Sequence, residues 1–161
     1  MRRDFRRMTS EFRNHWRFYL LQSLMAAGAI LTVLLVLGFE HSFLIGSLGS
    51  TAFTVFAMPN NITARARNVL GGHLTGLACG LLLSFIPITG MVTGTLVLGP
   101  AVGLAMFLMV VFDFEHPPAA GTALGAAMAG YSAHVVITIV VGAAVLAALH
   151  ALLKKWLYDL V

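Results

Sequence analysis

The sequence predicts an all-α fold, a polytopic helical membrane bundle, and three observations support this. The first is composition: 59% of the 161 residues are hydrophobic and only 10% are charged, whereas soluble domains carry about 25% charged residues. The second is the recurrence of apolar runs of about 18 or more residues, which are long enough to cross a bilayer. The third is that the basic residues cluster at the ends of these runs. Together these features indicate a single integral membrane domain.

We expect about six membrane segments within a transmembrane domain at residues 18–153. The stretch 117–153 must be divided, because one helix of that length would measure roughly 55 Å, against about 30 Å for a hydrocarbon core. The second and fifth segments are short, so helices at the two inner hairpins, 59–67 and 113–117, are expected to be short or broken. The expected segments are 18–39, 42–58, 68–86, 91–112, 118–130 and 133–153.

The basic residues also predict an orientation. In a six-span arrangement all ten Lys and Arg residues fall on one side, within residues 1–17, 59–67 and 154–161. This asymmetry matches the positive-inside rule and predicts a multi-pass protein of the cell inner (plasma) membrane with both termini cytoplasmic. Five spans are the alternative, but they would place Lys154 and Lys155 outside.

The two ends of the chain are predicted to lie at the cytoplasmic interface. Residues 1–17 are rich in arginine and carry large apolar residues at helical spacing, which is typical of an amphipathic helix on an anionic membrane surface. Residues 154–161 form a short tail. The apolar residues at helical spacing are Phe5, Met8, Phe12 and Trp16.

Glycines recur at four-residue intervals in three of the predicted helices. Small residues at this spacing allow membrane helices to approach closely. They predict tight packing within the bundle, and a homo-oligomer formed through one such face. The repeats are Gly72, Gly76 and Gly80, then Gly99 and Gly103, then Gly121 and Gly125.

Polar residues gather in "DFEHPPAAGTALG", residues 113–125, between two apolar segments. Proline suits the first turn of a helix, so Pro117 and Pro118 are expected to start the fifth segment. The free N–H groups of that turn, around Ala119 to Gly121, would then form an anion site. The third segment, which starts near Asn68, offers a second helix start. Discontinuous helices that begin at a central site recur in transporters.

These features predict an anion site between the two inner hairpins. Arginines would attract the anion, helix starts would bind it, Asn68 and Thr122 would donate hydrogen bonds, and His73 or His116 would carry a proton. Asp113 or Glu115 would pair with an arginine and act as a gate. The candidate binding residues are Arg65, Arg67, Asn68, His73, His116, Ala119, Gly121 and Thr122.

Less specific interpretations stand beside this one. Asp113, Glu115 and His116 also fit a solvated inner loop, and a lone membrane histidine such as His73 commonly makes a helix-to-helix hydrogen bond. A metal site built from these four residues is less favoured, because no spaced Cys/His signature supports it. We expect no cofactor and no nucleic-acid partner, since no phosphate-binding loop is present.

Two motifs resemble the HPP family of integral membrane proteins. One is "EHPPAAGTAL", which contains His116-Pro117-Pro118. The other is "MPNNITARARNVLGGH", in which Asn61-Ile62 and Arg65-Ala66 replace the usual Ser-Pro and Gln-Pro. The resemblance implies a small polytopic membrane protein and, from members in chloroplasts and cyanobacteria, nitrite transport. The positions that match the second motif are Pro59, Ala64, Arg67, Asn68, Gly71, Gly72 and His73.

The leading hypothesis is therefore a transporter or channel for a small monovalent anion, with nitrite as the best single guess. Its partners would be that inorganic anion and the lipid bilayer, and we expect no enzymatic activity. One alternative is a cation or proton pathway using Asp113, Glu115 and His116. Another is an intramembrane enzyme in which Glu115 and His116 act as acid and base. A third is a membrane assembly subunit that transports nothing.

Overall fold

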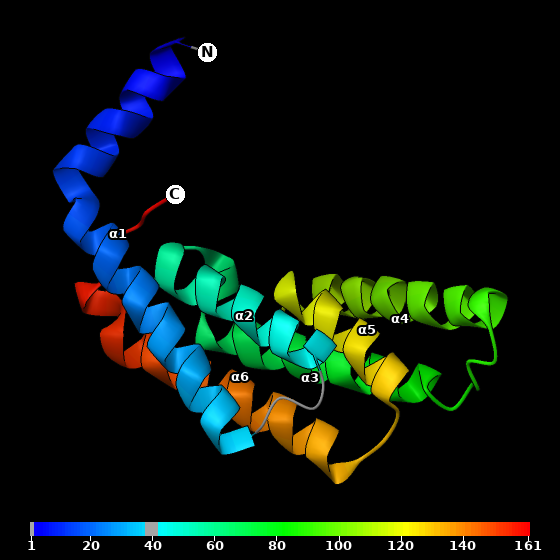
Figure 1. Cartoon of the computed structure of the whole chain (residues 1–161). Helices are drawn as coiled ribbons and strands as arrows, with labels where there is room; N and C mark the ends of the chain where they lie inside the picture. The colour runs from blue at the N-terminus through cyan, green and yellow to red at the C-terminus, as the bar shows by residue number, and fades with distance from the viewer. Residues whose placement is uncertain (1, 38–41) are drawn as a thin grey trace.

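A computed structural model describes residues 2–37 and 42–161, and the side chains of residues 13–35 and 43–161. Over this part the chain is a bundle of α-helices (Figure 1). The predicted all-α membrane bundle is confirmed. The elements are α1 (Arg2–Leu37), α2 (Ser42–Ala57), η1 (Ile62–Ala64), α3 (Ala66–Leu83), α4 (Met91–Val111), α5 (Pro118–Ala129), α6 (Ala133–Leu153) and η2 (Lys154–Trp156).

The helices follow the predicted segments closely, with one clear shift in α3. This helix begins at Ala66 and ends at Leu83, not at Ile86 as predicted. The early end has a simple cause, because Ile86 precedes Pro87 and a residue before proline is disfavoured in the α conformation. The predicted division of residues 117–153 is confirmed. There the chain turns at Gly130, whose φ of 73° favours glycine.

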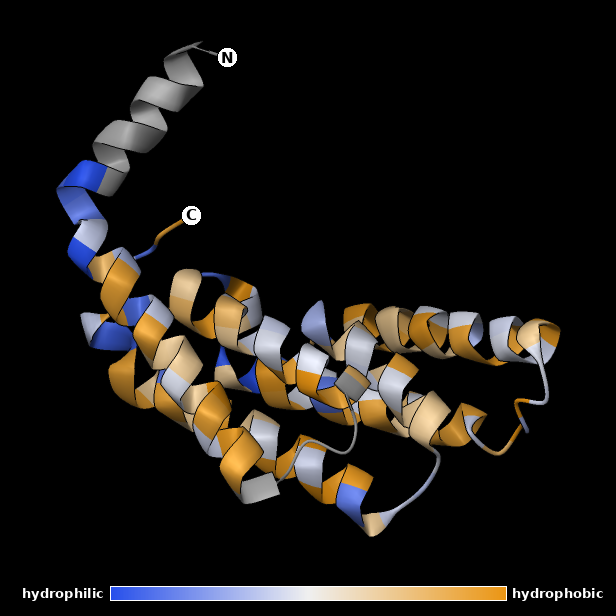
Figure 2. Cartoon of the chain, viewed as in Figure 1, coloured by the Kyte–Doolittle hydropathy of each residue, from blue (hydrophilic) through white to orange (hydrophobic). Residues whose placement is uncertain are grey.

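The predicted amphipathic segment, residues 1–17, does not form a helix of its own over the described residues 2–17. Helix α1 continues without a break from Arg2 into the first apolar segment (Figure 1). The sequence contains no glycine or proline before Gly28 to end the helix. Figure 2 shows α1 change from hydrophilic to hydrophobic along this one helix. The predicted end of the first span at residue 39, and the side chains of Phe5, Met8 and Phe12, lie outside the described residues.

Helix lengths divide the described segments into two groups. By length and composition, residues 13–35 of α1, α4, and α6 extended to Trp156 can each cross a membrane. The apolar part of α2, Phe43–Ala57, is shorter. Helix α5 has 12 residues and is about 18 Å long. It is therefore shorter than a hydrocarbon core of about 30 Å.

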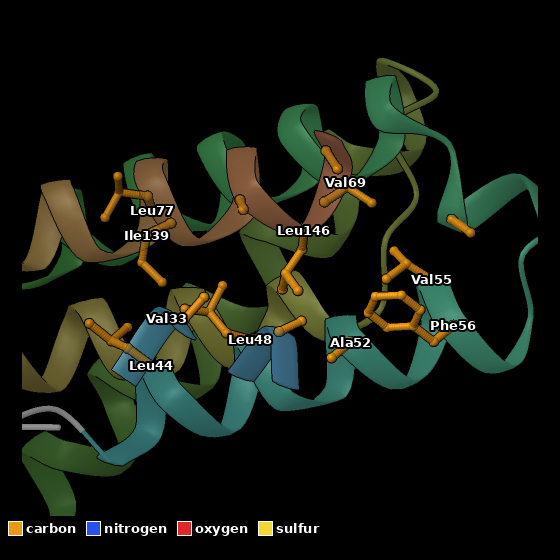
Figure 3. Packing of buried hydrophobic residues seen from close by; sticks show 14 of the residues in the cluster. Val33, Leu44, Leu48, Ala52, Val55, Phe56, Val69, Leu77, Ile139 and Leu146 are labelled. Carbon is orange, nitrogen blue, oxygen red and sulfur yellow. The ribbon is translucent and has the colours of Figure 1, made fainter. Parts of the chain in front are cut away.

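Helix α2 lies at the centre of the largest apolar cluster. It packs against α1, α5 and α6, and its side chains point toward residues of α1, α3 and α6 (Figure 3). Leu44, Leu48 and Phe56 are almost fully buried. The short central helix is thus held on several sides, which fixes the polar side chains that it also carries.

Two of the three glycine repeats provide close helix contacts. A Cβ atom on Gly76 or Gly80 would meet the carbonyl oxygen of Ala119 or Ala123, so the backbones of α3 and α5 nearly touch. Gly125 of α5 packs against the side chain of Leu44 of α2. The repeat on α4 differs, because nothing lies within 4 Å of a Cβ built on its two members, Gly99 and Gly103.

The tail and the first hairpin meet at one end of the bundle. The side chain of Gln22, which is 1% exposed, donates to the carbonyl oxygens of Phe56 and Tyr158 and accepts from the Tyr158 N–H. His150 of α6 donates to the carbonyl oxygen of Pro59 over 3.0 Å. The predicted inner segments 59–67 and 154–161 therefore lie on the same side of the bundle.

Candidate functional site

The second hairpin leaves α4 through a defined turn. The N–H of Asp113 bonds the carbonyl oxygen of Val110 over 3.2 Å, and that of Phe114 bonds Met109 over 2.7 Å. This pair of bonds is the Schellman motif, which ends a helix through one residue in the left-handed region. That residue is Asp113, with φ 58°, and aspartate tolerates this conformation better than most residues. The turn directs the following residues back over α3.

Arg67 joins the two hairpins at the surface. Its guanidinium donates to Asp113 Oδ2 over 2.7 Å and to the carbonyl oxygen of Phe112 over 3.1 Å. It also lies 5.0 Å from the centre of the Phe114 ring. Of the pairings expected between Asp113 or Glu115 and an arginine, the one between Arg67 and Asp113 is present. Both side chains are more than half exposed, 59% and 65%, so the pair contributes little to stability.

Deeper contacts hold the hairpins together below this pair. Asn68 donates from Nδ2 to the carbonyl oxygen of Glu115 over 3.2 Å. His116 donates from Nδ1 to the carbonyl oxygen of Thr63 over 2.8 Å. The expectation that the two inner hairpins converge is therefore met, and the contacts reach from the surface into the bundle.

Two adjacent glycines of α3 make room for the second hairpin. A Cβ on Gly71 would lie 2.6 Å from Cγ of Phe114, and one on Gly72 would lie 2.6 Å from Cβ of His116. Both distances are shorter than real contacts of this kind. The Gly71-Gly72-His73 sequence therefore provides the space in which the hairpin packs, and also the histidine that lies beside His116.

A buried set of polar side chains, which we call the histidine–hydroxyl network, lies next to this contact between α3 and the second hairpin. Its centre is the Thr51 hydroxyl of α2, which is 2.8 Å from Nε2 of His73 and 3.0 Å from Nε2 of His116. His73 Nδ1 is 2.7 Å from the hydroxyl of Thr122, which is 2.6 Å from that of Ser47. The five side chains, each at most 4% exposed, are Ser47, Thr51, His73, His116 and Thr122.

Three of the residues in these contacts were not singled out from the sequence. Ser47 and Thr51 are four residues apart on an apolar helix, so they share one face. A polar pair at this spacing is the signal that would have identified them. Thr63 takes part through its backbone oxygen, and no sequence pattern predicts that.

The structure does not support the predicted anion site at the start of α5. The N–H of Ala119 bonds the carbonyl oxygen of His116, and that of Ala120 bonds Pro117. Pro117 has helical backbone angles, so tight bonds close the first turn and use these donors. Gly121 packs against Ser47 and does not leave an open approach for a ligand.

The two arginines predicted to attract the anion lie at the surface, outside the buried part of the contact between the hairpins. Arg65 is exposed at the N-cap of α3, and Arg67 is exposed and bound to Asp113. Neither contributes a hydrogen bond to the histidine–hydroxyl network. The network is thus formed by neutral hydroxyls and imidazoles, with the positive charge at the surface above it.

A cavity of about 290 Å³ lies between α4 and the start of α5, beside the network. Its walls are mostly apolar, and Glu115 and His116 supply its titratable side chains. The lining residues are Val102, Met106, Met109, Val110, Glu115, His116, Pro117 and Ala120.

Burial controls the charge of His116, which lies in the hairpin between α4 and α5. Removal from water lowers the pKa of His116, although the bond to the Thr63 carbonyl oxygen opposes this effect. The ring is therefore neutral at pH 7. In the part of the chain that the structure describes, no three His, Cys, Asp or Glu residues are grouped so that they could hold a metal ion.

Comparison with known proteins gives one match. The family model described as "HPP, transmembrane region" matches residues 11–159, nearly the whole chain and all of the residues that form the site. No curated protein and no solved structure matches the sequence.

Proposed function

Because the chain belongs to the family of the HPP transmembrane region, we propose that it is a membrane transporter for a small monovalent anion, with nitrite as the first substrate to test. The observation that carries this proposal is the convergence of two hairpins on two buried histidines, with a cavity beside them and two arginines above. The anion would cross near this convergence, from the surface arginines toward the histidine–hydroxyl network.

The surface of the convergence is suited to attract an anion. Arg65 and Arg67 are exposed at the start of α3, and the N-terminus of a helix carries a partial positive charge. The side chain of Arg65, the N-cap residue, makes no capping hydrogen bond there. Asp113 neutralises part of this charge through Arg67, so breaking that pair would increase attraction for an anion.

The interior offers donors without fixed negative charge. A small anion is stabilised by hydroxyl and imidazole N–H groups that replace its water. Thr51, Thr122 and the two histidines carry such groups, all of them buried, and a hydrogen bond among them would open to turn a donor toward the anion. Asn68, 2% exposed, lies between the surface arginines and this interior. A chain of polar groups therefore leads inward from the point of attraction.

The geometry gives less support to the alternatives. Both ring nitrogens of His116 face protein atoms, so neither points at a substrate in the cavity as a catalytic acid or base would. Of the two carboxylates considered for a cation pathway, Asp113 is bound to Arg67, which leaves Glu115 as the one carboxylate at the cavity. These contacts favour anion transport over an intramembrane enzyme or a cation pathway.

The test is nitrite uptake into proteoliposomes by the wild type, Arg67→Ala, His116→Ala and the distant control Lys155→Ala. We expect wild-type uptake that saturates with nitrite and is inhibited by other small monovalent anions. Arg67→Ala should raise KM, His116→Ala should remove most of the flux, and Lys155→Ala should leave both unchanged. Wild-type uptake equal to that of empty vesicles, for nitrite and for the competing anions, would contradict the proposal.

A further inference from the structure

The histidine–hydroxyl network has fewer protons than hydrogen bonds. Seven bonds join its five side chains to one another and to three backbone carbonyl oxygens. A full bond needs one proton of its own between its two heavy atoms, since a proton shared by two acceptors binds each more weakly. The three hydroxyls supply one proton each, and two neutral imidazoles supply one each. With both rings neutral, the network is therefore two protons short.

One shortage can be located at Thr51. The carbonyl oxygen of Thr63 can only accept, so Nδ1 of His116 carries that ring's proton and Nε2 is bare when the ring is neutral. Nε2 faces the Thr51 hydroxyl, whose single proton is also directed toward His73 Nε2 and the carbonyl oxygen of Ser47. Whichever of these partners receives the proton of Thr51, at least one other contact of the Thr51 oxygen then has lone pairs on both atoms and no proton between them. An added proton on an imidazole nitrogen removes this conflict.

The network can accept one additional proton, but not two. The rings of His73 and His116 lie with centroids 5.1 Å apart, and two like charges at that separation disfavour each other strongly when buried. A single imidazolium also needs a counter-charge, because a lone buried cation is costly.

Among the described residues around the network, no negatively charged group lies within hydrogen-bonding distance of either imidazole. Helices α2 and α5 contribute the neutral hydroxyls of Ser47, Thr51 and Thr122. Asp113 is at the surface on Arg67, and α4 presents apolar residues to the cavity. His150 of α6 binds Pro59. Among the residues that line the cavity, Glu115 alone carries a carboxylate.

We propose that the histidine–hydroxyl network binds one proton together with one monovalent anion in the adjoining cavity, so that proton and anion cross the membrane together. This inference rests on the proposed anion transport, and it identifies the proton as the ion that crosses together with the anion. The proton binds the lone pair of an imidazole nitrogen on one side and returns to water on the other, while the anion supplies the counter-charge. No other bond changes, and the net charge moved is zero.

The experiment measures nitrite uptake and internal pH together in proteoliposomes, with an imposed pH gradient or an imposed potassium diffusion potential. Empty vesicles correct for nitrous acid that crosses the lipid unaided. We expect internal acidification of one proton per nitrite, faster uptake when the outside is acidic, and no effect of the membrane potential.

Matched variants test the role of the network. Thr51→Val removes the shared hydroxyl and should lower pH-driven uptake roughly tenfold or more, whereas Thr51→Ser should retain it. Thr54→Val is the control, since Thr54 lies on the same helix but bonds only the carbonyl oxygen of Ser50. Glu115→Gln should keep proton movement dependent on nitrite. Loss of proton movement in Glu115→Gln would make that carboxylate the carrier and overturn the assignment to the network.

The outcomes separate the coupling from the transport function. Nitrite uptake that follows the potential without acidification would overturn the coupling and leave anion transport standing. Uptake no greater than in empty vesicles would overturn both. If Thr51→Val does not fold, the wild type in detergent serves instead: nitrite added to weakly buffered protein should raise the external pH by uptake of one proton, and no change would overturn the coupling.

Discussion

His73 and His116 come from different elements of the chain and share the hydroxyl of Thr51, with their ring centroids 5.1 Å apart. Helix α3 supplies one ring and the hairpin before α5 supplies the other. Their separation is fixed by Gly72, which lets the backbone of the hairpin lie directly on α3. Two histidines that are distant in the sequence thus form one unit, and the first prediction concerns its protonation.

His116 should be the Nδ1–H tautomer at neutral pH without added anion. The carbonyl oxygen of Thr63 accepts from Nδ1 over 2.8 Å, and a carbonyl cannot donate in return. Nitrogen NMR of protein labelled at histidine distinguishes the two tautomers, and a His116→Asn sample assigns the signal. A His116 signal typical of the Nε2–H form would contradict the described bond.

Acid should destabilise the protein, and nitrite should oppose this effect. The pKa of His116 is lowered in the folded state from its ordinary value of 6.5. The stability gained from a neutral ring is therefore full above pH 6.5 and is lost as the pH falls below it, because the unfolded chain binds the proton more readily. Thermal unfolding in detergent should show a lower Tm in acid, with a smaller loss in His116→Asn. Nitrite should raise Tm most in acid, and equal effects at all pH values would count against coupled binding.

Alanine at Gly76 should destabilise the bundle, whereas alanine at Gly99 should not. The new Cβ at Gly76 would meet the carbonyl oxygen of Ala119, a backbone atom that cannot move aside. Overpacking of this kind costs about 1–3 kcal/mol. At Gly99 nothing lies within 4 Å of the Cβ, and alanine favours a helix by about 1 kcal/mol. Equal thermal stability of the two variants would show that α3 and α5 are not in close contact.

The two partners of the surface ion pair should change transport in opposite directions. Asp113→Asn keeps a residue that accepts the left-handed conformation and releases Arg67, so KM for nitrite should fall. Arg67→Ala should raise KM. A double-mutant cycle on unfolding should give a coupling of only about 0.2–1 kcal/mol, because both side chains are exposed. A rise in KM for both variants would indicate that the pair has only a structural role.

The helices were largely predictable because hydrophobic length and helix-ending residues determine them. Prolines, glycines and the length limit of the bilayer set the bounds of α2, α4, α5 and α6 within a residue or two. The apolar pattern of α3 continues three residues past the observed end of the helix, because apolar length does not reflect the restriction that Pro87 imposes on Ile86. The continuity of α1 was missed because a change in charge was interpreted as a break in the helix.

The site was only partly predictable, since its contacts depend on packing. Both histidines were identified from the sequence, as was an ion pair between the hairpins, although the sequence did not decide which carboxylate and which arginine form it. The role of Thr51 was not, because α2 carries several hydroxyls and a hydroxyl on an apolar helix commonly bonds its own backbone. The donors at Ala119 and Ala120 were wrongly expected to be free, because the helical conformation of Pro117 depends on how His116 is held.

The most direct test of the site is a titration of histidine-labelled protein with nitrite, followed by nitrogen NMR. We predict saturable shifts at His73 and His116, and no shift at His150, which is equally buried but bound to Pro59 outside the network. If nitrite leaves the signals of His73 and His116 unchanged, or moves His150 as much as these two, the anion does not bind where the hairpins meet.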